Sequence, residues 1–115
     1  MSYKFKEIWC NKGNFTESNR KSSEIDTLVI HYTGNNGDTA ENNGNYFKNN
    51  VVETSAHYFV DDTTVVRSVA DKNIAWHAGD WNINCRSIGI EIAGSTTECT
   101  GKTLENVILL TQRLT

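Results

Sequence analysis

The chain has 115 residues, of which 37% are hydrophobic and 22% charged, and its formal net charge is −3. This length predicts one domain with a core of its own, and the composition is typical of a globular rather than a disordered protein. No apolar run approaches the ~20 residues of a membrane span, and the first ten residues lack the apolar segment of a signal peptide. With 11 basic against 14 acidic side chains and no basic stripe, we do not expect nucleic acid as a partner.

The three cysteines, Cys10, Cys85 and Cys99, contain no C-x-x-C pair. They allow one disulfide with a free thiol, or three reduced thiols, and the second interpretation is the plainer one.

The first half of the chain contains one confident strand and one helix. Residues 1–26 are polar and mixed, and they predict an N-terminal arm that packs through Ile8 and Trp9. Residues 27–32 predict a buried strand that carries His31 near its end. After a Gly/Asn-rich loop, Asp38 or Thr39 is a suitable cap for a helix that runs to about Asn49.

The second half predicts a hairpin, a strand and a final helix. Alternation over residues 56–60 and 64–68, with Asp61-Asp62 between them, is typical of a β-hairpin. Residues 87–93 predict a further strand. A helix follows to residue 115, with Thr103 as its expected N-cap. Strands mixed with two helices predict an α/β fold, a mixed central β-sheet with helices packed on its faces.

The residues able to do chemistry are three histidines and one strand glutamate. Taken singly, His31, His57 and His77 are each more plausible as structural or surface residues than as ligands. Glu91 shares one strand face with Gly89 and Ala93, where burial would be costly unless the carboxylate is paired or used. If that face meets solvent, Glu91 costs nothing.

A strand-end histidine with a glutamate on a neighbouring strand favours hydrolysis at a metal ion such as Zn²⁺. The carboxylate would then take the proton of the attacking water. No G-x-S-x-G motif supports a serine hydrolase, and nothing around Cys85 indicates an activated thiol.

Four segments, LVIHYTGN, SAHYFVDD, AWHAG and CRSIGIEIAG, occur in this order between residues 28 and 94. Together they resemble the zinc-dependent N-acetylmuramoyl-L-alanine amidases of the phage-lysozyme and peptidoglycan-recognition type. The resemblance covers about residues 25–114. It implies a mixed sheet covered by helices, and cleavage of the amide bond between the lactyl group of N-acetylmuramic acid and L-alanine in peptidoglycan.

The resemblance also assigns two residues directly to the reaction. His31 matches the first zinc ligand of that family. Glu91 matches the glutamate with which one branch activates water. Other members use a tyrosine before the hairpin histidine, but Ala56 stands at that position here, which leaves Glu91 as the candidate.

Three further residues are expected to line the substrate groove. His77 matches a groove position rather than a zinc ligand, and Trp76 and Trp81 are expected to give the groove apolar walls. His57 matches a residue that is usually buried or near the site, and a structural role is the better expectation.

The resemblance departs from the family pattern at the C-terminal end. The second histidine ligand and a third ligand, aspartate or cysteine, normally follow the last helix, and no histidine follows His77 here. We therefore expect residues 27–115 to be an amidase-like catalytic domain lacking its C-terminal segment, with the remaining Zn²⁺ ligands outside this chain. The isolated chain is expected to be inactive and to form a homodimer through the surface left uncovered.

Three hypotheses follow for the function. The first is a zinc amidase that acts on the bacterial cell wall, as a phage endolysin or as an autolysin exported without its own signal peptide. The second is a non-catalytic peptidoglycan-binding module. The third is an unrelated α/β domain, which four ordered motifs disfavour.

Overall fold

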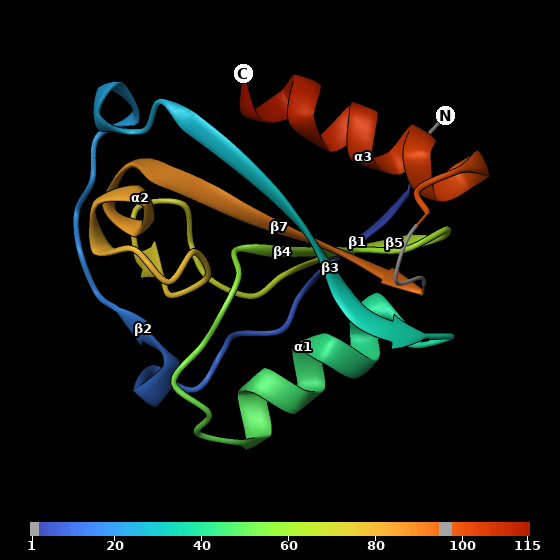
Figure 1. Cartoon of the computed structure of the whole chain (residues 1–115), viewed down its shortest axis with the longest axis horizontal. Coiled ribbons are helices and arrows are strands. Elements are labelled where there is room, and N and C mark those ends of the chain that lie inside the picture. Colours follow the sequence, from blue (N-terminus) through green and yellow to red (C-terminus); the bar gives the residue numbers. More distant parts are fainter. Residues whose placement is uncertain (1–2, 95–97) are drawn as a thin grey trace.

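The computed structural model describes residues 3–94 and 98–115, and its centre is a five-stranded sheet in the order β1-β5-β4-β7-β3 (Figure 1). β4 and β5 form the predicted antiparallel hairpin, whereas β7 runs parallel to both β4 and β3, and β1 runs parallel to β5. The mixed central sheet is thus confirmed. Its strands are β1 (Lys4–Glu7), β3 (Thr27–Asn36), β4 (Tyr58–Val60), β5 (Thr64–Arg67) and β7 (Ser87–Gly94).

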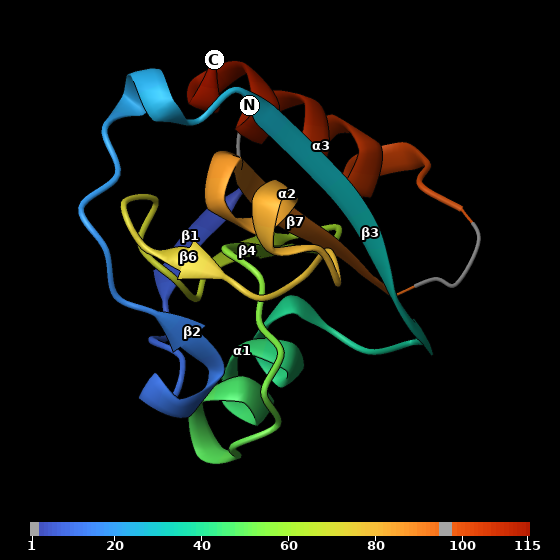
Figure 2. The same cartoon turned by 60° about the vertical axis from the view of Figure 1, so that its left-hand side comes forward.

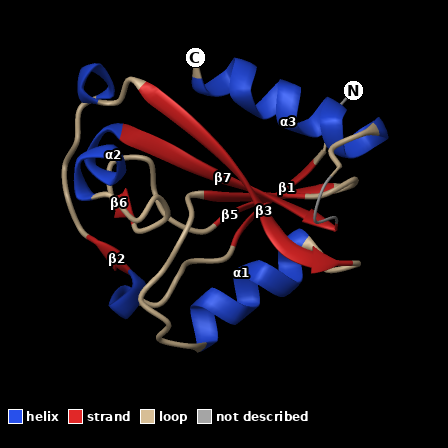
Figure 3. Cartoon of the chain, in the orientation of Figure 1, coloured by secondary structure: helices blue, strands red, loops and turns tan. Residues whose placement is uncertain are grey.

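Two helices cover opposite faces of this sheet, α1 (Ala40–Asn49) on one side and α3 (Gly101–Leu114) on the other (Figure 3). Alternation along the strands builds a separate core on each face. Ile88, Ile90 and Ile92 of β7 pack on the α3 side. On the α1 side, Phe59 packs with residues of α1 and β5.

The register of the sheet puts three side chains in one row on the α1 face. Glu91 of β7 pairs with His31 of β3 on one side and with Phe59 of β4 on the other. Residues in register on neighbouring parallel strands point to the same face. The sheet therefore brings His31 and Glu91 together, although sixty residues separate them in the sequence.

The main predicted elements are confirmed, with changes at their ends. The strand from Thr27 continues to Asn36, but the expectation that it is buried is wrong: it lies at the edge of the sheet, none of its residues is fully buried, and Ile30 is 48% exposed. Thr39 caps α1, because its hydroxyl accepts from the N–H of Asn42. The expected start of the last helix at Thr103 is wrong. The helix begins at Gly101, whose φ of 57° makes the turn into it, and Thr100 occupies the cap position.

The N-terminal residues contribute more than an arm. Lys4–Glu7 form β1, an edge strand whose four residues are all exposed and which gives no alternating signal. Ile8 packs against the core on the α1 side, as expected. Trp9 remains 48% exposed, and the guanidinium of Arg67 lies 5.8 Å from its ring centre.

Further short elements, which the sequence does not predict, lie beside the sheet (Figure 2). They include the two-stranded pair β2 (Phe15–Thr16) and β6 (Ile74–Ala75), and the helix α2 (Trp81–Arg86). Two 3-10 turns span Lys12–Asn14 and Ser22–Glu24. All three cysteines are free thiols. In the part of the chain that the structure describes, no helix has the length and apolar character needed to cross a membrane.

Candidate active site

A cavity of about 720 Å³ lies on the α1 side of the sheet. Its walls come from β3, α1, the segments before β4 and after β6, and β7. Among the described residues, three carboxylates line it, those of Asp38, Glu53 and Glu91, and no lysine or arginine does. Tyr46, Phe47 and Phe59 with Trp76 add aromatic surface. A cavity of this size, largely apolar with a few polar groups, is typical of ligand sites.

Glu91 is partly buried in this cavity rather than turned to open solvent. Its Oε1 is buried and has no hydrogen-bond partner among the described residues. Burial, and to a smaller extent the nearby charge of Asp38, raises the pKa of Glu91 to about 7. Both forms of the carboxyl group are therefore populated near neutral pH, which suits a group that accepts and returns a proton.

The Asp38 carboxylate is held in place by two donors. The backbone N–H of Gly94 donates to Oδ1 at 2.6 Å, and the side-chain amide of Asn43 donates to Oδ2 at 2.7 Å. This anchoring fixes a negative charge next to Glu91. It therefore contributes to the raised pKa of Glu91 without forming a bond to it.

His77 lines the cavity and contacts His31. The Nδ1 atom of His77 lies 3.0 Å from Nε2 of His31, and its Nε2 lies 2.9 Å from the hydroxyl oxygen of Ser87. Burial, and then the charge of His31, lowers the pKa of His77 to about 4; burial also lowers the pKa of His31. Both rings are therefore neutral at pH 7. His31 itself is not among the cavity-lining residues and reaches the site through His77.

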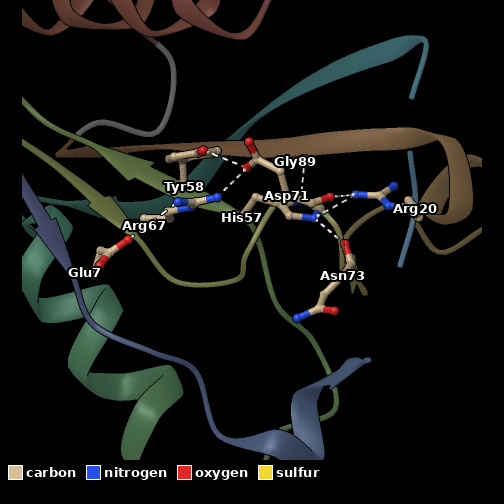
Figure 4. Close-up of polar contacts among 8 residues, drawn as sticks. All are labelled: Glu7, Arg20, His57, Tyr58, Arg67, Asp71, Asn73 and Gly89. Carbon is tan, nitrogen blue, oxygen red and sulfur yellow. Dashed lines mark hydrogen bonds and ion pairs between the residues drawn. The ribbon is translucent and has the colours of Figure 1, made fainter. Parts of the chain in front are cut away.

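His57 has the structural role that the sequence favours (Figure 4). The backbone N–H of Gly89 donates to Nδ1 at 3.1 Å, so the ring proton sits on Nε2 and is donated to the carbonyl of Asn73 at 2.8 Å. The ring is fully buried, and burial lowers its pKa to about 3. This neutral imidazole joins β7 to the segment before β6.

Arg20 is a site-supporting residue that the sequence does not identify. Its Nη1 donates to the carbonyls of Asn84, Cys85 and Ser87, which end α2 and begin β7. Its Nη2 donates to the carbonyl of Asp71 and lies 3.1 Å from Nε2 of His57. A single arginine in a polar N-terminal run gives no signal of this role, because its partners are backbone carbonyls.

Asn14 supports the opposite wall of the cavity in the same manner. This fully buried side chain donates to the carbonyls of Phe47 and Asn50, and accepts from the N–H groups of Val52 and Glu53. It thereby fixes the end of α1 to the segment that leads to the cavity wall. Glu53 has a φ of 59°, which a non-glycine residue rarely adopts.

The two tryptophans expected in the groove behave differently. Trp76 lines the cavity; its backbone N–H donates to the hydroxyl of Ser55 and its indole N–H to the hydroxyl of Thr16. Trp81 begins α2, is 58% exposed and does not line this cavity. The structure therefore brings Trp76, His77 and Glu91 to one cavity and leaves Trp81 outside it.

Comparison with known proteins identifies the family of this chain. The sequence profile of the N-acetylmuramoyl-L-alanine amidase family matches residues 21–115. The chain belongs to this amidase family. Its curated relatives include the N-acetylmuramoyl-L-alanine amidases CwlA and XlyB of Bacillus subtilis. CwlA is 41% identical over 71 residues, which are 59% of this chain and 26% of the relative, and XlyB is 31% identical over 98 residues, 83% and 31%.

Solved amidase structures share the fold. The catalytic domain of XlyA superposes with a TM-score of 0.80 at 29% identity, covering 96% of this chain and 74% of that one. The PlyG catalytic domain gives a TM-score of 0.80 at 25% identity, covering 96% and 69%. This amidase-family chain thus spans most of these catalytic domains, but only about a quarter to a third of the two curated relatives.

Members of this amidase family are generally zinc-dependent. Zinc sites take three or four protein ligands, from cysteine, histidine or carboxylate side chains. Within residues 3–94 and 98–115, no group of three or more such side chains is placed to hold a metal ion. The described residues therefore do not form a complete zinc site by themselves.

Proposed function

We propose that this chain is the amidase part of a peptidoglycan hydrolase, which cleaves the bond between the lactyl group of N-acetylmuramic acid and L-alanine. The observation that carries the proposal is Glu91, a partly buried carboxyl group with an unpartnered oxygen in a ligand-sized cavity. Family membership over residues 21–115 supports the reaction class. The place of action would be the bacterial cell wall, where an endolysin or autolysin works.

Glu91 would act as the general base and then as the general acid. Its carboxylate takes a proton from water, whose oxygen forms a bond to the lactyl carbonyl carbon. The carbon–nitrogen bond then breaks, and Glu91 returns the proton to the departing amine of L-alanine. A pKa of about 7 suits both transfers, because the proton is neither held too tightly nor released too easily.

His77 and Trp76 would bind the substrate. Both lie along the cavity with Glu91, and each is held by further hydrogen bonds, so their positions are set before a ligand arrives. Trp81 is retained only as a candidate for contacts outside this cavity, since its ring is exposed at the start of α2.

Zn²⁺ is proposed as the cofactor of the complete site, with His31 as one ligand and the others from outside the described residues. When bound, such an ion lowers the pKa of water and polarises a carbonyl group. The match of residues 21–115 to this amidase family supports the assignment of His31.

The chain is also proposed to self-associate as a homodimer. β3 ends the sheet and pairs on one side only among the described strands. Ile30 on this strand is 48% exposed, and Leu104 and Ile108 of α3 are 41% and 46% exposed. Light scattering at increasing concentration tests this; a constant monomer mass at high micromolar concentration would contradict it.

A non-catalytic peptidoglycan-binding module is the second candidate, favoured by the incomplete ligand set. One experiment separates the two. Muramyl dipeptide is titrated into the ¹⁵N-labelled chain, and released L-alanine amino groups are assayed on purified peptidoglycan with added Zn²⁺. The assay is repeated with the complete gene product if the reading frame continues past Thr115.

Both hypotheses predict that the amide chemical shifts of Trp76, His77 and Glu91 change when the dipeptide is added. Amino-group release by the complete product, lost in Glu91→Gln, supports the amidase. Binding without release in any form supports the binding module. If the dipeptide shifts no cavity residue and no amino groups are released, the proposed function is wrong.

A further inference from the structure

We infer that Ser87 and Gly89 are positioning residues, which seat the imidazole of His77 on β7 and through it fix the ring of His31. The inference rests on the proposed function for its consequence in substrate binding. Its structural part depends only on contacts within the chain. Neither residue lines the cavity, since Ser87 is fully buried and Gly89 has no side chain.

Gly89 provides the space on which the His77 ring lies. A Cβ atom at this position would lie 2.6 Å from Cγ, 2.7 Å from Cδ2 and 2.9 Å from Nδ1 of His77. Carbon atoms in contact are normally ~3.5–4.0 Å apart. Any residue other than glycine would therefore displace the ring.

The strand cannot move away to relieve such a clash. Both backbone polar groups of Gly89 are bonded to His57: the N–H donates to Nδ1 at 3.1 Å, and the carbonyl accepts from the His57 N–H at 2.9 Å. His57 is itself buried and fixed to Asn73. Gly89 does not have a positive φ, so its role here is the space it leaves and not its backbone freedom.

Ser87 forms a hydrogen bond with the same ring. It lies two residues before Gly89 and so points to the same face of β7, with its hydroxyl oxygen 2.9 Å from Nε2 of His77. Ser87 is fully buried, so its hydroxyl needs a hydrogen-bond partner, and Nε2 of His77 provides one. On its other side the ring contacts His31, because Nδ1 of His77 lies 3.0 Å from Nε2 of His31.

The backbone of His77 and Ala78 is also held in place. Asn84 accepts at its Oδ1 from the N–H of Ala78 at 2.9 Å and from that of His77 at 3.3 Å. Packing against Gly89, the hydrogen bond with Ser87 and the hydrogen-bonded backbone of His77 together fix the position of the ring. Since His77 lines the cavity and contacts His31, a displaced ring would misplace both imidazoles.

A double-mutant cycle on the full 115-residue chain tests the packing contact between Gly89 and His77. Gly89→Ala should lower the urea midpoint clearly in the natural background and change it little in the His77→Ala background, because the clashing ring is then absent. An equal loss in both backgrounds overturns the inference. If Gly89→Ala alone does not fold, the double variant must still fold as well as His77→Ala; its failure to do so is equally decisive against the inference.

Nitrogen NMR of the histidine rings tests the hydrogen bond between Ser87 and His77. Ser87→Ala should change the tautomer-sensitive ¹⁵N shifts of His77 and of His31, whereas Ser68→Ala, which removes a buried hydroxyl that does not contact His77, should leave them unchanged. If Ser87→Ala leaves the His77 shifts as they are, Ser87 does not position the ring. A merely structural serine would alter stability without altering these shifts.

The affinity for muramyl dipeptide tests whether the positioning of His77 matters for the proposed function. Ser87→Ala should weaken it by about two- to tenfold, the equivalent of one neutral hydrogen bond, and Ser68→Ala should not. If the natural chain binds no dipeptide, the proposed function fails, while the mutant cycle and the NMR shifts still decide whether His77 is seated as described. If the dipeptide binds all variants equally, the positioning role in binding is refuted.

Discussion

Acidification offers a direct test of the buried His57, whose replacement by glutamine keeps a donor and an acceptor but removes the titration. The folded pKa of His57 is lowered to about 3, chiefly by burial. In the unfolded chain the pKa is about 6.5. Because the unfolded state binds the proton more readily, this group contributes stability that is fully present above pH 6.5 and is lost as the pH falls toward 3.

The size of the effect follows from the two pKa values. Between pH 7.5 and pH 5, linkage predicts a loss of about 2 kcal/mol from His57 alone. This figure depends mainly on the unfolded pKa, since the folded ring stays neutral at pH 5. In His57→Gln, the decrease in unfolding free energy over this interval should therefore be about 2 kcal/mol smaller than in the natural chain.

Urea unfolding, followed by circular dichroism at half-unit pH steps, measures this difference. His31→Gln is the matched control. His31 is only half-buried, so its removal should flatten the pH dependence by less. Parallel pH profiles for the natural chain and His57→Gln would refute the argument, because His57 would then take up its proton in the folded state at an ordinary pKa.

Four further outcomes are expected. In the form of the protein that releases amino groups from peptidoglycan in the assay proposed above, Glu91→Gln should lower turnover by ~10²–10⁴-fold with the fold unchanged; near-normal release of L-alanine-terminated peptides would exclude the general-base role. Asn14→Ala should destabilise the chain by about 3–5 kcal/mol, since it removes the hydrogen-bond partner of the Asn50 carbonyl and of the N–H groups of Val52 and Glu53; a loss below 1 kcal/mol in urea unfolding would argue against this role of Asn14. Arg86 donates two hydrogen bonds to Asp26 and lowers the pKa of that carboxyl to about 2, so NMR titration of Arg86→Gln should return it toward the ordinary range, and an unchanged value would contradict the pairing. The 115-residue chain should retain no stoichiometric zinc after dialysis, as metal analysis can check; tight binding by a monomer would show that His31, His57 and His77 need a new interpretation.

Residues 27–32 were predicted as a strand from an apolar run, but they lie at the edge of the sheet and none of them is fully buried. The hairpin around Asp61-Asp62 and residues 87–93 were predicted correctly because they consist largely of buried residues, whose apolar pattern is visible in the sequence. β1 was missed for the opposite reason. All four of its residues are exposed, and only its backbone pairing with β5 makes it a strand.

For the candidate site, too, some features could be predicted from the sequence and others could not. The sequence by itself determined which residues could do chemistry, since the imidazoles of His31 and His77 and the carboxyl group of Glu91 are evident in ordered motifs. It also indicated a structural His57. The buried environment that raises the pKa of Glu91, and the placement of Trp76 but not Trp81 along the cavity, depend on packing between distant segments.

The tertiary structure alone decided how these groups meet. The register of β3 against β7 puts His31 beside Glu91, and the missing side chain of Gly89 lets His77 lie on the sheet. Arg20 and Asn14 act on backbone carbonyls and N–H groups that every residue possesses. Such partners leave no mark in the sequence, because what selects them is their position after folding and not their residue type.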